Sequence, residues 1–353
     1  MISDVTKYSG SYAKICAMKS KLLTHGDYMR LADLCCVRDI ALYLKETVRY
    51  KAIFENADID NMDRLSFEEL ICNSGDIDLI SLRRFIGTEG KELLTLFVME
   101  KEVAFLKQIL RSIESESKYQ PGFDDGGILR KYFSFDVNHI AECTNIEELA
   151  DILQGTKYYK QLNMFVQNPE FYSLFNMEMA LDTYYYKYAW NTAKKSLKGT
   201  EKRAFLQSYG SKIDMLNIMW ILRCKKYFNI DAKTLKSLIL PIYYSLRKEE
   251  VDDMIGAPDE EELYSILQRT KYGFIFKDRE KSFEQIWANV NMEKQAKAAK
   301  VNPFSIFTII EYLNVKETEI KNLMKIAEAT EYNLDKSEIL QYITTKGGRE
   351  FGC

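Results

Sequence analysis

The sequence has few residues that interrupt helices. Only 5 of its 353 residues are proline and 16 are glycine, the two residue types that disfavour a helix interior most strongly. No run of convincing length alternates between apolar and polar residues, as a half-buried strand does. With 46% hydrophobic residues, the composition predicts an all-α fold with little disorder.

Histidine and paired cysteines are also scarce. The chain has 2 histidines, His25 and His139, and 7 scattered cysteines with no C-x-x-C pair. This leaves few ligands for a zinc site and no disulfide framework. An odd number of scattered cysteines is typical of a protein in a reducing compartment. We expect these cysteines to be buried and to pack as small hydrophobic residues. We expect no catalytic set, no metal site and no cofactor.

The chain lacks a strong charge of either sign and a long apolar run. The formal net charge is −3, which argues against a nucleic-acid partner because such proteins present a basic field to phosphates. No stretch approaches the roughly 18 apolar residues of a membrane span, and the N-terminus has no signal-peptide core. We therefore expect a soluble, cytoplasmic protein without direct lipid insertion.

What the sequence does contain is a repeated motif. EELADILQGTKY at 147–158 and EELYSILQRTKY at 261–272 share nine of twelve residues, and DIALYLKETVRY at 39–50 is a weaker third copy. The apolar residues fall at i, i+3 and i+4, which is one face of a helix. Thr144 with Glu147 and Asp259 with Glu262 are plausible capping boxes at the helix starts.

A second motif follows the first at a similar distance. EVAFLKQILR at 102–111, DMLNIMWILR at 214–223 and EIKNLMKIAE at 319–328 each begin with an acid and repeat aliphatic residues at the same places. Since 353 residues exceed the roughly 250–300 that one core accommodates, the two motifs predict three divergent helical lobes. Their expected ranges are 1–120, 121–240 and 241–353.

One segment offers a metal-site alternative. In DIDNMDRLSFEE, Asp58, Asp60 and Glu69 occupy positions 1, 3 and 12 of an EF-hand loop, but position 6, where the turn requires glycine, is Asp63. The simpler interpretation is a polar loop followed by a helix that Ser66 caps with Glu69. A calcium-regulated helical protein remains an alternative.

Four further stretches have simple structural interpretations. GTEGKE at 87–92 lacks the spacing of a phosphate-binding loop and is interpreted as a loop before a helix. PGFDDGG at 121–127 is interpreted as a turn, with an acidic ligand site as the alternative. The basic run AKKSLKGTEKR at 193–203 is typical of a turn between two helices. Asp252 and Asp253 are expected in a charged turn.

The C-terminal third resembles a known family. The segment from Pro303 to Leu323, PFSIFTIIEYLNVKETEIKNL, resembles the most characteristic stretch of the C subunit of archaeal-type and vacuolar-type rotary ATPases, called the d subunit in the eukaryotic vacuolar enzyme. YAKICAMKSKLL at 12–23, ALDTYYYKY at 180–188 and DMLNIMWILRCKKYF at 214–228 are similar to other segments of that family. The first helix, with Lys14 and Cys16 where the family often has arginine, and the GGREFGC tail depart from its pattern.

The resemblance implies a funnel-shaped, pseudo-threefold arrangement of three similar helical lobes. It implies a non-catalytic central-stalk adaptor, peripheral on the cytoplasmic face of the membrane, that links the shaft subunits of the ATPase head to the membrane rotor ring. Such an adaptor passes torque for proton or sodium transport or for ATP synthesis. Arg111 and Arg223 share one place in the repeat, where the third copy has Glu328, and are candidate partner contacts, although an ion pair within their own lobe explains them equally well. The alternative is a helical-repeat protein-binding scaffold unrelated to rotary ATPases.

Overall fold

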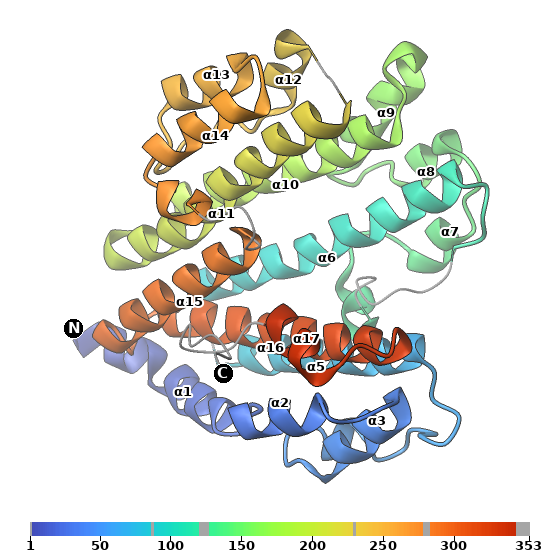
Figure 1. Cartoon of the computed structure of the whole chain (residues 1–353), viewed down its shortest axis with the longest axis vertical. Helices are drawn as coiled ribbons and strands as arrows, with labels where there is room; N and C mark the ends of the chain where they lie inside the picture. The colour runs from blue at the N-terminus through green and yellow to red at the C-terminus, as the bar shows by residue number, and fades with distance from the viewer. Residues whose placement is uncertain (1, 86–87, 120–126, 229–230, 278–282, 344–353) are drawn as a thin grey trace. The chain divides into compact units, whose positions relative to one another are not determined.

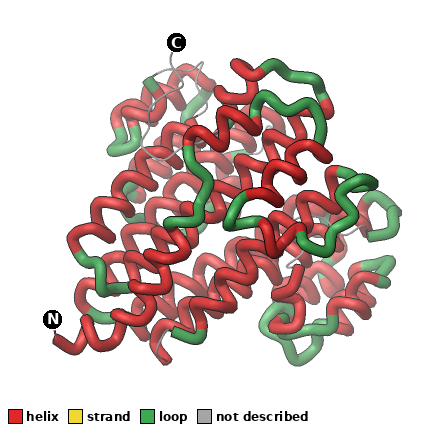
Figure 2. Tube along the Cα trace, turned by 90° about the horizontal axis from the view of Figure 1, so that it is seen from below, coloured by secondary structure: helices red, strands yellow, loops and turns green. Residues whose placement is uncertain are grey.

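The computed structural model describes residues 2–85, 88–119, 127–228, 231–277 and 283–343. Within these ranges every regular element is a helix (Figure 2), which confirms the all-α prediction. Contacts between residues divide the chain into two compact units, one of Met1–Tyr185 with Asn302–Cys353 and one of Tyr186–Val301. The predicted division into three lobes stays a prediction.

The first unit contains segments from both ends of the chain, and the last helix of its N-terminal part, α10, continues into the second unit. In chain order its helices are α1 (Ile2–Lys19), α2 (His25–Leu31), α3 (Val37–Glu46), α4 (Lys51–Phe54), α5 (Arg64–Arg83), α6 (Thr88–Glu114), η1 (Gly127–Tyr132), α7 (Val137–Ala141), α8 (Ile146–Ile152), α9 (Tyr159–Gln167), η2 (Pro169–Phe171), α10 (Leu174–Ser196), α16 (Ile306–Glu331) and α17 (Lys336–Tyr342). Helix α16 packs along α5 and α1, far apart from it in sequence (Figure 1).

An apolar core joins the two ends of the chain within this unit. Leu31, Ile40 and Phe67 from the N-terminal helices meet Leu323 and Ile326 of α16, and all five side chains are 0% exposed. Burying an aliphatic or aromatic side chain stabilises the fold by about 1.5–3 kcal/mol. The N-terminal helices and α16 therefore form one packed body.

The second unit is built around one long helix. Its helices are α11 (Gly199–Arg223), the π-helical turn η3 (Cys224–Phe228), α12 (Ala232–Leu238), α13 (Lys248–Gly256), α14 (Glu260–Arg269), η4 (Gly273–Phe276) and α15 (Phe283–Val301). Helix α11 packs against α15, and α13 packs against α12 and α14. The second motif thus lies in three long helices of 27, 25 and 26 residues, α6, α11 and α16.

The helix starts agree only partly with the predicted caps. Asp259 caps α14 as predicted and accepts a hydrogen bond from the Glu262 N–H at 2.8 Å. The other two predictions are wrong by one and three residues. Asn145, not Thr144, caps α8, and Asp63, not Ser66, caps α5, because the oxygens of these side chains reach the amides three residues ahead.

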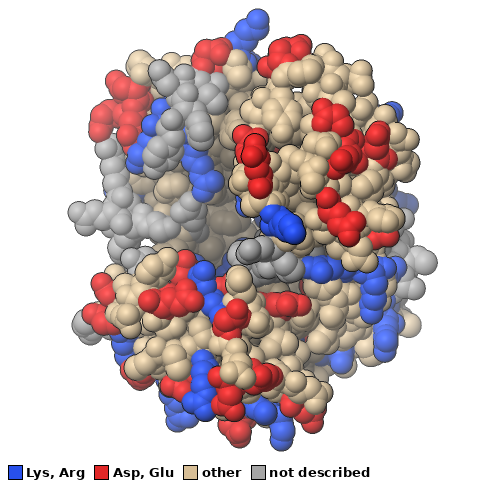
Figure 3. Space-filling view, turned by 90° about the vertical axis from the view of Figure 1, so that its right-hand side faces the viewer, with Lys and Arg blue, Asp and Glu red and all other residues tan. Residues whose placement is uncertain are grey.

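The basic run forms the predicted turn. Helix α10 ends at Ser196 and α11 begins at Gly199, whose φ of +53° is a conformation that glycine adopts without strain. Acidic and basic side chains are interspersed on the face in Figure 3. A concentrated basic patch of the kind that binds phosphates is not seen on that face.

Two minor expectations are corrected. Cys16, Cys35 and Cys36 are exposed rather than buried, since a thiol has little apolar area to hide. Asp252 and Asp253 lie on helix α13 and not in a turn. The Asp252 carboxylate forms an ion pair with Lys236 of α12 at 2.7 Å, so its charge has a partner on the neighbouring helix.

We expect Gly210→Ala to destabilise the protein. A Cβ at Gly210 on α11 would lie 2.4 Å from Cγ of Tyr244, whose backbone N–H is fixed by a hydrogen bond to Asp214. Overpacking of this kind costs about 1–3 kcal/mol. A Cβ at Gly256, at the end of α13, would meet nothing within 4 Å. Gly256→Ala is therefore the matched control, and equal urea midpoints for the two variants would contradict the predicted close packing.

Candidate functional site

The repeated first motif folds into the same turn in all three copies. At or just after the end of each helix, a threonine donates both its N–H and its hydroxyl to the carbonyl of the leucine three residues earlier. A tyrosine follows two or three residues later. The N–H distances are 2.9 Å from Thr47 to Leu44, 2.9 Å from Thr156 to Leu153 and 3.1 Å from Thr270 to Leu267. The tyrosine N–H then donates to the threonine oxygen at 3.2–3.3 Å. The recurring threonine therefore closes the turn at the end of the helix and positions the tyrosine that follows.

Each of these tyrosines donates its hydroxyl to the acid that begins one copy of the second motif. The distances are 2.8 Å from Tyr50 to Glu319, 2.6 Å from Tyr158 to Glu102 and 2.9 Å from Tyr272 to Asp214. Every one of the six side chains belongs to a residue that is at most 5% exposed. We call this arrangement the tyrosine–carboxylate contact.

The same three acids also accept backbone N–H groups from the segment before the first short helix of each hairpin. The donors are Leu23 to Glu319 at 2.7 Å, Ser134 to Glu102 at 2.5 Å, and Ser245 and Leu246 to Asp214 at 2.6 and 3.1 Å. A single carboxylate on a long helix thus holds both ends of a hairpin of two short helices. The hairpins are α2–α3, α7–α8 and α13–α14.

The order of pairing is shifted by one copy along the chain. The second tyrosine pairs with the first acid, the third tyrosine with the second acid, and the first tyrosine with the third acid. Each contact therefore joins residues from opposite sides of the boundaries predicted at 120 and 240, or from the two ends of the chain. Sequence order alone does not reveal this cyclic order.

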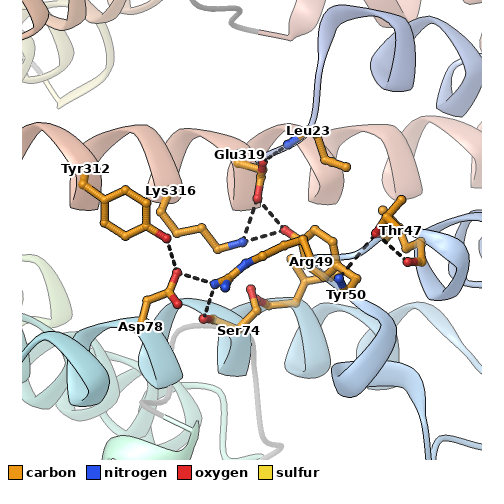
Figure 4. A network of polar contacts seen from close by, with 11 residues as sticks. Leu23, Thr47, Arg49, Tyr50, Ser74, Asp78, Tyr312, Lys316 and Glu319 are labelled. Carbon is orange, nitrogen blue, oxygen red and sulfur yellow. Dashed lines mark hydrogen bonds and ion pairs between the residues drawn. The ribbon is translucent and has the colours of Figure 1, made fainter. Parts of the chain in front are cut away.

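The contact between the two ends of the chain carries extra charges (Figure 4). The Nζ of Lys316 on α16 lies 2.7 Å from both the Tyr50 hydroxyl and a Glu319 carboxylate oxygen. Arg49 donates to the Ser74 carbonyl at 3.2 Å and pairs with Asp78 on α5, which also accepts the hydroxyl of Tyr312. We call these residues the closing network.

The closing network is electrically balanced inside the protein. Two cations, Lys316 and Arg49, face two carboxylates, Glu319 and Asp78, and the Lys316 and Glu319 side chains are only 2% and 3% exposed. Burial lowers the pKa of Lys316 while the Glu319 carboxylate opposes that shift, and burial raises the pKa of the Tyr50 hydroxyl. Removing one member of such a set leaves an uncompensated buried charge, at a cost of about 3–5 kcal/mol.

The other two contacts have fewer charged partners. Lys157, next to Tyr158, places its Nζ 3.1 Å from Glu102. Asp214 relies on backbone N–H groups and Tyr272. Burial raises the pKa of Asp214, although these hydrogen bonds to its charged form act in the opposite direction.

The predicted partner residues lie outside this site. Arg111 is near the end of α6, where its Nε is 2.6 Å from a carboxylate oxygen of Glu178 and its side chain is 58% exposed. Arg223 is the last residue of α11 and is exposed. In the third copy, Glu328 pairs with Arg64 at 3.8 Å. Glu178 lies beyond the boundary predicted at 120, so this ion pair is not within the predicted lobe of Arg111. A role in partner binding stays a prediction.

The EF-hand-like segment uses its acids for other contacts. Asp60 accepts two hydrogen bonds from Arg38 at 3.0 and 2.8 Å, Asp63 caps α5, and Met62 packs against the apolar core. In the described part of the chain no three potential metal ligands come together. The acidic stretch 121–126 lies outside the described residues, as does Gly87, and GKE at 90–92 lies within α6.

None of the described helices is both long and apolar enough to cross a bilayer.

The residues gathered at the tyrosine–carboxylate contacts are hydrogen-bonded to one another and buried. What this arrangement can do is hold helices together. Fold and site together define an all-α protein in which one buried contact recurs three times.

Comparison with known proteins identifies the family. A family model described as "ATP synthase (C/AC39) subunit" matches residues 11–342, and the chain therefore belongs to that family. It is similar to the C subunit of the A-type ATP synthase of Methanobrevibacter smithii, with 25% identity over 97% of this chain and 89% of the relative. The corresponding values are 24%, 97% and 92% for Pyrococcus abyssi and 25%, 96% and 86% for Methanocaldococcus jannaschii. These matches confirm the resemblance seen in the sequence.

The residues of the tyrosine–carboxylate contacts stand at recurring places in the sequence, which does not reveal that they pair. The tyrosine ends every copy of the first motif, and the acid begins every copy of the second. Because the tyrosine and the acid recur at the same places of the internal repeat, the repeat could have indicated that both are buried. The closing network, however, includes Asp78, Arg49 and Tyr312, of which two lie outside both motifs and have no repeat to mark them.

We expect Tyr50→Phe and Tyr272→Phe each to destabilise the protein by about 1–3 kcal/mol, because each leaves a buried carboxylate short of one donor. The control is Tyr332→Phe, since Tyr332 is 69% exposed and should change stability by no more than about 0.5 kcal/mol. Urea unfolding of the purified variants measures the difference. If the three variants unfold alike, the hydroxyls do not stabilise the fold.

The raised pKa of Asp214 predicts a pH dependence. Because its folded pKa lies above the unfolded value of about 4, the folded state binds the proton more tightly. The stability from this group is present at low pH and is lost as pH rises through the folded pKa. The wild type should therefore gain stability relative to Asp214→Asn as pH falls from 7 toward 4, and a constant difference would contradict the shift.

Proposed function

We propose that the chain is a non-catalytic adaptor of a rotary ATPase that connects the central shaft to the membrane rotor ring and transmits torque between them. The observation that carries this proposal is the family match over residues 11–342. Relatives named as the C subunit of A-type ATP synthases align over nearly their whole length, which supports a role in the same kind of machine.

The physical basis of torque transfer is resistance to deformation. Packed helical cores have low compressibility, and each long helix is fastened to a hairpin by a buried carboxylate. Breaking such a contact costs the full desolvation of its polar groups. An adaptor of this kind needs fixed joints rather than reactive side chains.

The membrane link is proposed to run through partner proteins. Since the described helices include none that could span a bilayer, attachment on the cytoplasmic face would come from the rotor ring. Helix ends that carry exposed cations offer contacts for such partners, and Arg111 and Arg223 are proposed as two of them. Arginine is enriched among the residues that dominate protein interfaces.

The alternative proposal is a helical-repeat scaffold for partners unrelated to rotary ATPases. A pull-down with the purified chain separates the two. The shaft subunits and the detergent-solubilised ring of the same organism are offered separately, and the adaptor role predicts that each is retained. Retention of neither would overturn the adaptor role and leave the scaffold.

Replacing Arg111 and Arg223 together with alanine should weaken binding of the shaft or the ring by at least about fivefold. It should also lower the number of ions pumped per ATP hydrolysed in the reassembled enzyme. Arg247→Ala is the matched control, because Arg247 is likewise exposed and ion-paired, with Glu250 at 2.9 Å. Unchanged binding and unchanged coupling in the double variant would remove both arginines from the interface.

A further inference from the structure

A small cavity lies inside the first unit between α5, α6 and η1. Its volume is about 130 Å³, and its walls include the aliphatic side chains of Leu79, Leu94, Val98 and Leu129. Leu79, Leu94 and Leu129 are at most 7% exposed. A dry aliphatic cavity of about 150 Å³ in another protein binds benzene and xenon. This cavity is therefore large enough for a short alkyl group.

One side of the cavity is formed by an aromatic ring that two cations contact, and only one of these cations, Arg83, lines the cavity itself. Tyr132 and Arg83 both line the cavity. The Arg83 guanidinium lies 5.3 Å from the centroid of the Tyr132 ring, and the Lys131 ammonium lies 5.3 Å from the same centroid. Tyr132 is 39% exposed, so this side of the cavity reaches the surface.

The two cations differ from others in the same unit. Lys107 pairs with Asp182 at 2.9 Å, and Arg49 pairs with Asp78, whereas the contacts of Arg83 and Lys131 with the described residues are to the Tyr132 ring and not to a carboxylate. Two cations on one ring repel each other. An anion that contacts both of them would relieve that repulsion and gain charge-assisted hydrogen bonds.

We propose that this cavity binds a free amphiphilic anion, with a short alkyl chain among the leucines and a carboxylate held by Arg83 and Lys131. The inference concerns a small-molecule site and goes beyond the adaptor role. It does not depend on that role, because binding to the isolated chain can be measured whether or not shaft and ring are retained.

Three probes with the same alkyl chain test the proposed head-group preference. Isothermal titration of the full-length chain with hexanoate, hexanol and hexylammonium should give saturable binding for hexanoate. We expect hexanol to bind about tenfold more weakly, since two partly exposed cations each contribute modestly, and hexylammonium to bind more weakly still. Equal affinity for the three probes, or none for hexanoate up to about 10 mM, would overturn the proposal.

Variants at two places distinguish the part of the cavity that holds the alkyl chain from the part that holds the carboxylate. Val98→Phe fills the cavity and should abolish binding of both hexanoate and hexanol. Arg83→Gln together with Lys131→Gln removes both cations and should reduce hexanoate affinity to that of hexanol. Lys118→Ala, at an exposed lysine outside the cavity, is the control and should bind like the wild type. Unchanged hexanoate binding in a folded Val98→Phe variant would contradict the site.

A direct observation of the cavity comes from a crystal exposed to xenon under pressure. A xenon atom should be found among Leu79, Leu94 and Leu129, and hexanoate should displace it. A crystal without xenon there would show that the space is not available. Binding of anionic lipid vesicles without binding of hexanoate would assign the cations to a membrane surface and overturn the proposal.

Discussion

The structure depends on a hydrogen bond between a buried tyrosine hydroxyl and a buried carboxylate, made three times. Each carboxylate also accepts backbone N–H groups, so that one side chain fastens a long helix to both ends of a short helical hairpin. Away from water such a contact is strong when complete and expensive when broken. The apolar cores supply most of the stabilisation, and these contacts determine which hairpin packs on which helix.

The contact that joins the two ends of the chain has a larger entropic cost than the others. Its partners are 269 residues apart, whereas the other pairs are 56 and 58 residues apart. Loop-closure entropy grows with the logarithm of the separation, and the difference amounts to about 1.4 kcal/mol. The apolar core shared by α16 and the N-terminal helices offsets this cost, and the closing network adds the charged pairs Lys316–Glu319 and Arg49–Asp78 at the same place. For the proposed adaptor, helix α16 and the N-terminal helices would then be held in one packed body.

The helical class and both motifs could be predicted from the sequence, because helix periodicity and scarce glycine and proline are local signals. The pairing of the tyrosines with the acids could not be predicted, because the spacing in the sequence fits two different pairings. Tyr158 lies 56 residues after Glu102 and, as 214 − 158 = 56 shows, equally far before Asp214, so spacing alone does not choose between them. Two of the predicted helix caps were wrong, by one and by three residues. Thr144 and Asn145 are both good capping residues, as are Asp63 and Ser66, so residue type alone does not choose between them. Whether Arg111 and Arg223 contact a partner could not be predicted, because such a contact depends on a surface that this sequence does not contain.

The most direct test of the account is a double-mutant cycle between Tyr50 and Glu319. Urea unfolding gives the stabilities of the wild type, Tyr50→Phe, Glu319→Leu, which has no acceptor oxygen, and the double variant. We expect a coupling free energy of at least about 1 kcal/mol, since the second substitution costs less once the first has broken the contact. Effects that add to within about 0.3–0.5 kcal/mol would show that the two ends of the chain are not held together by this hydrogen bond.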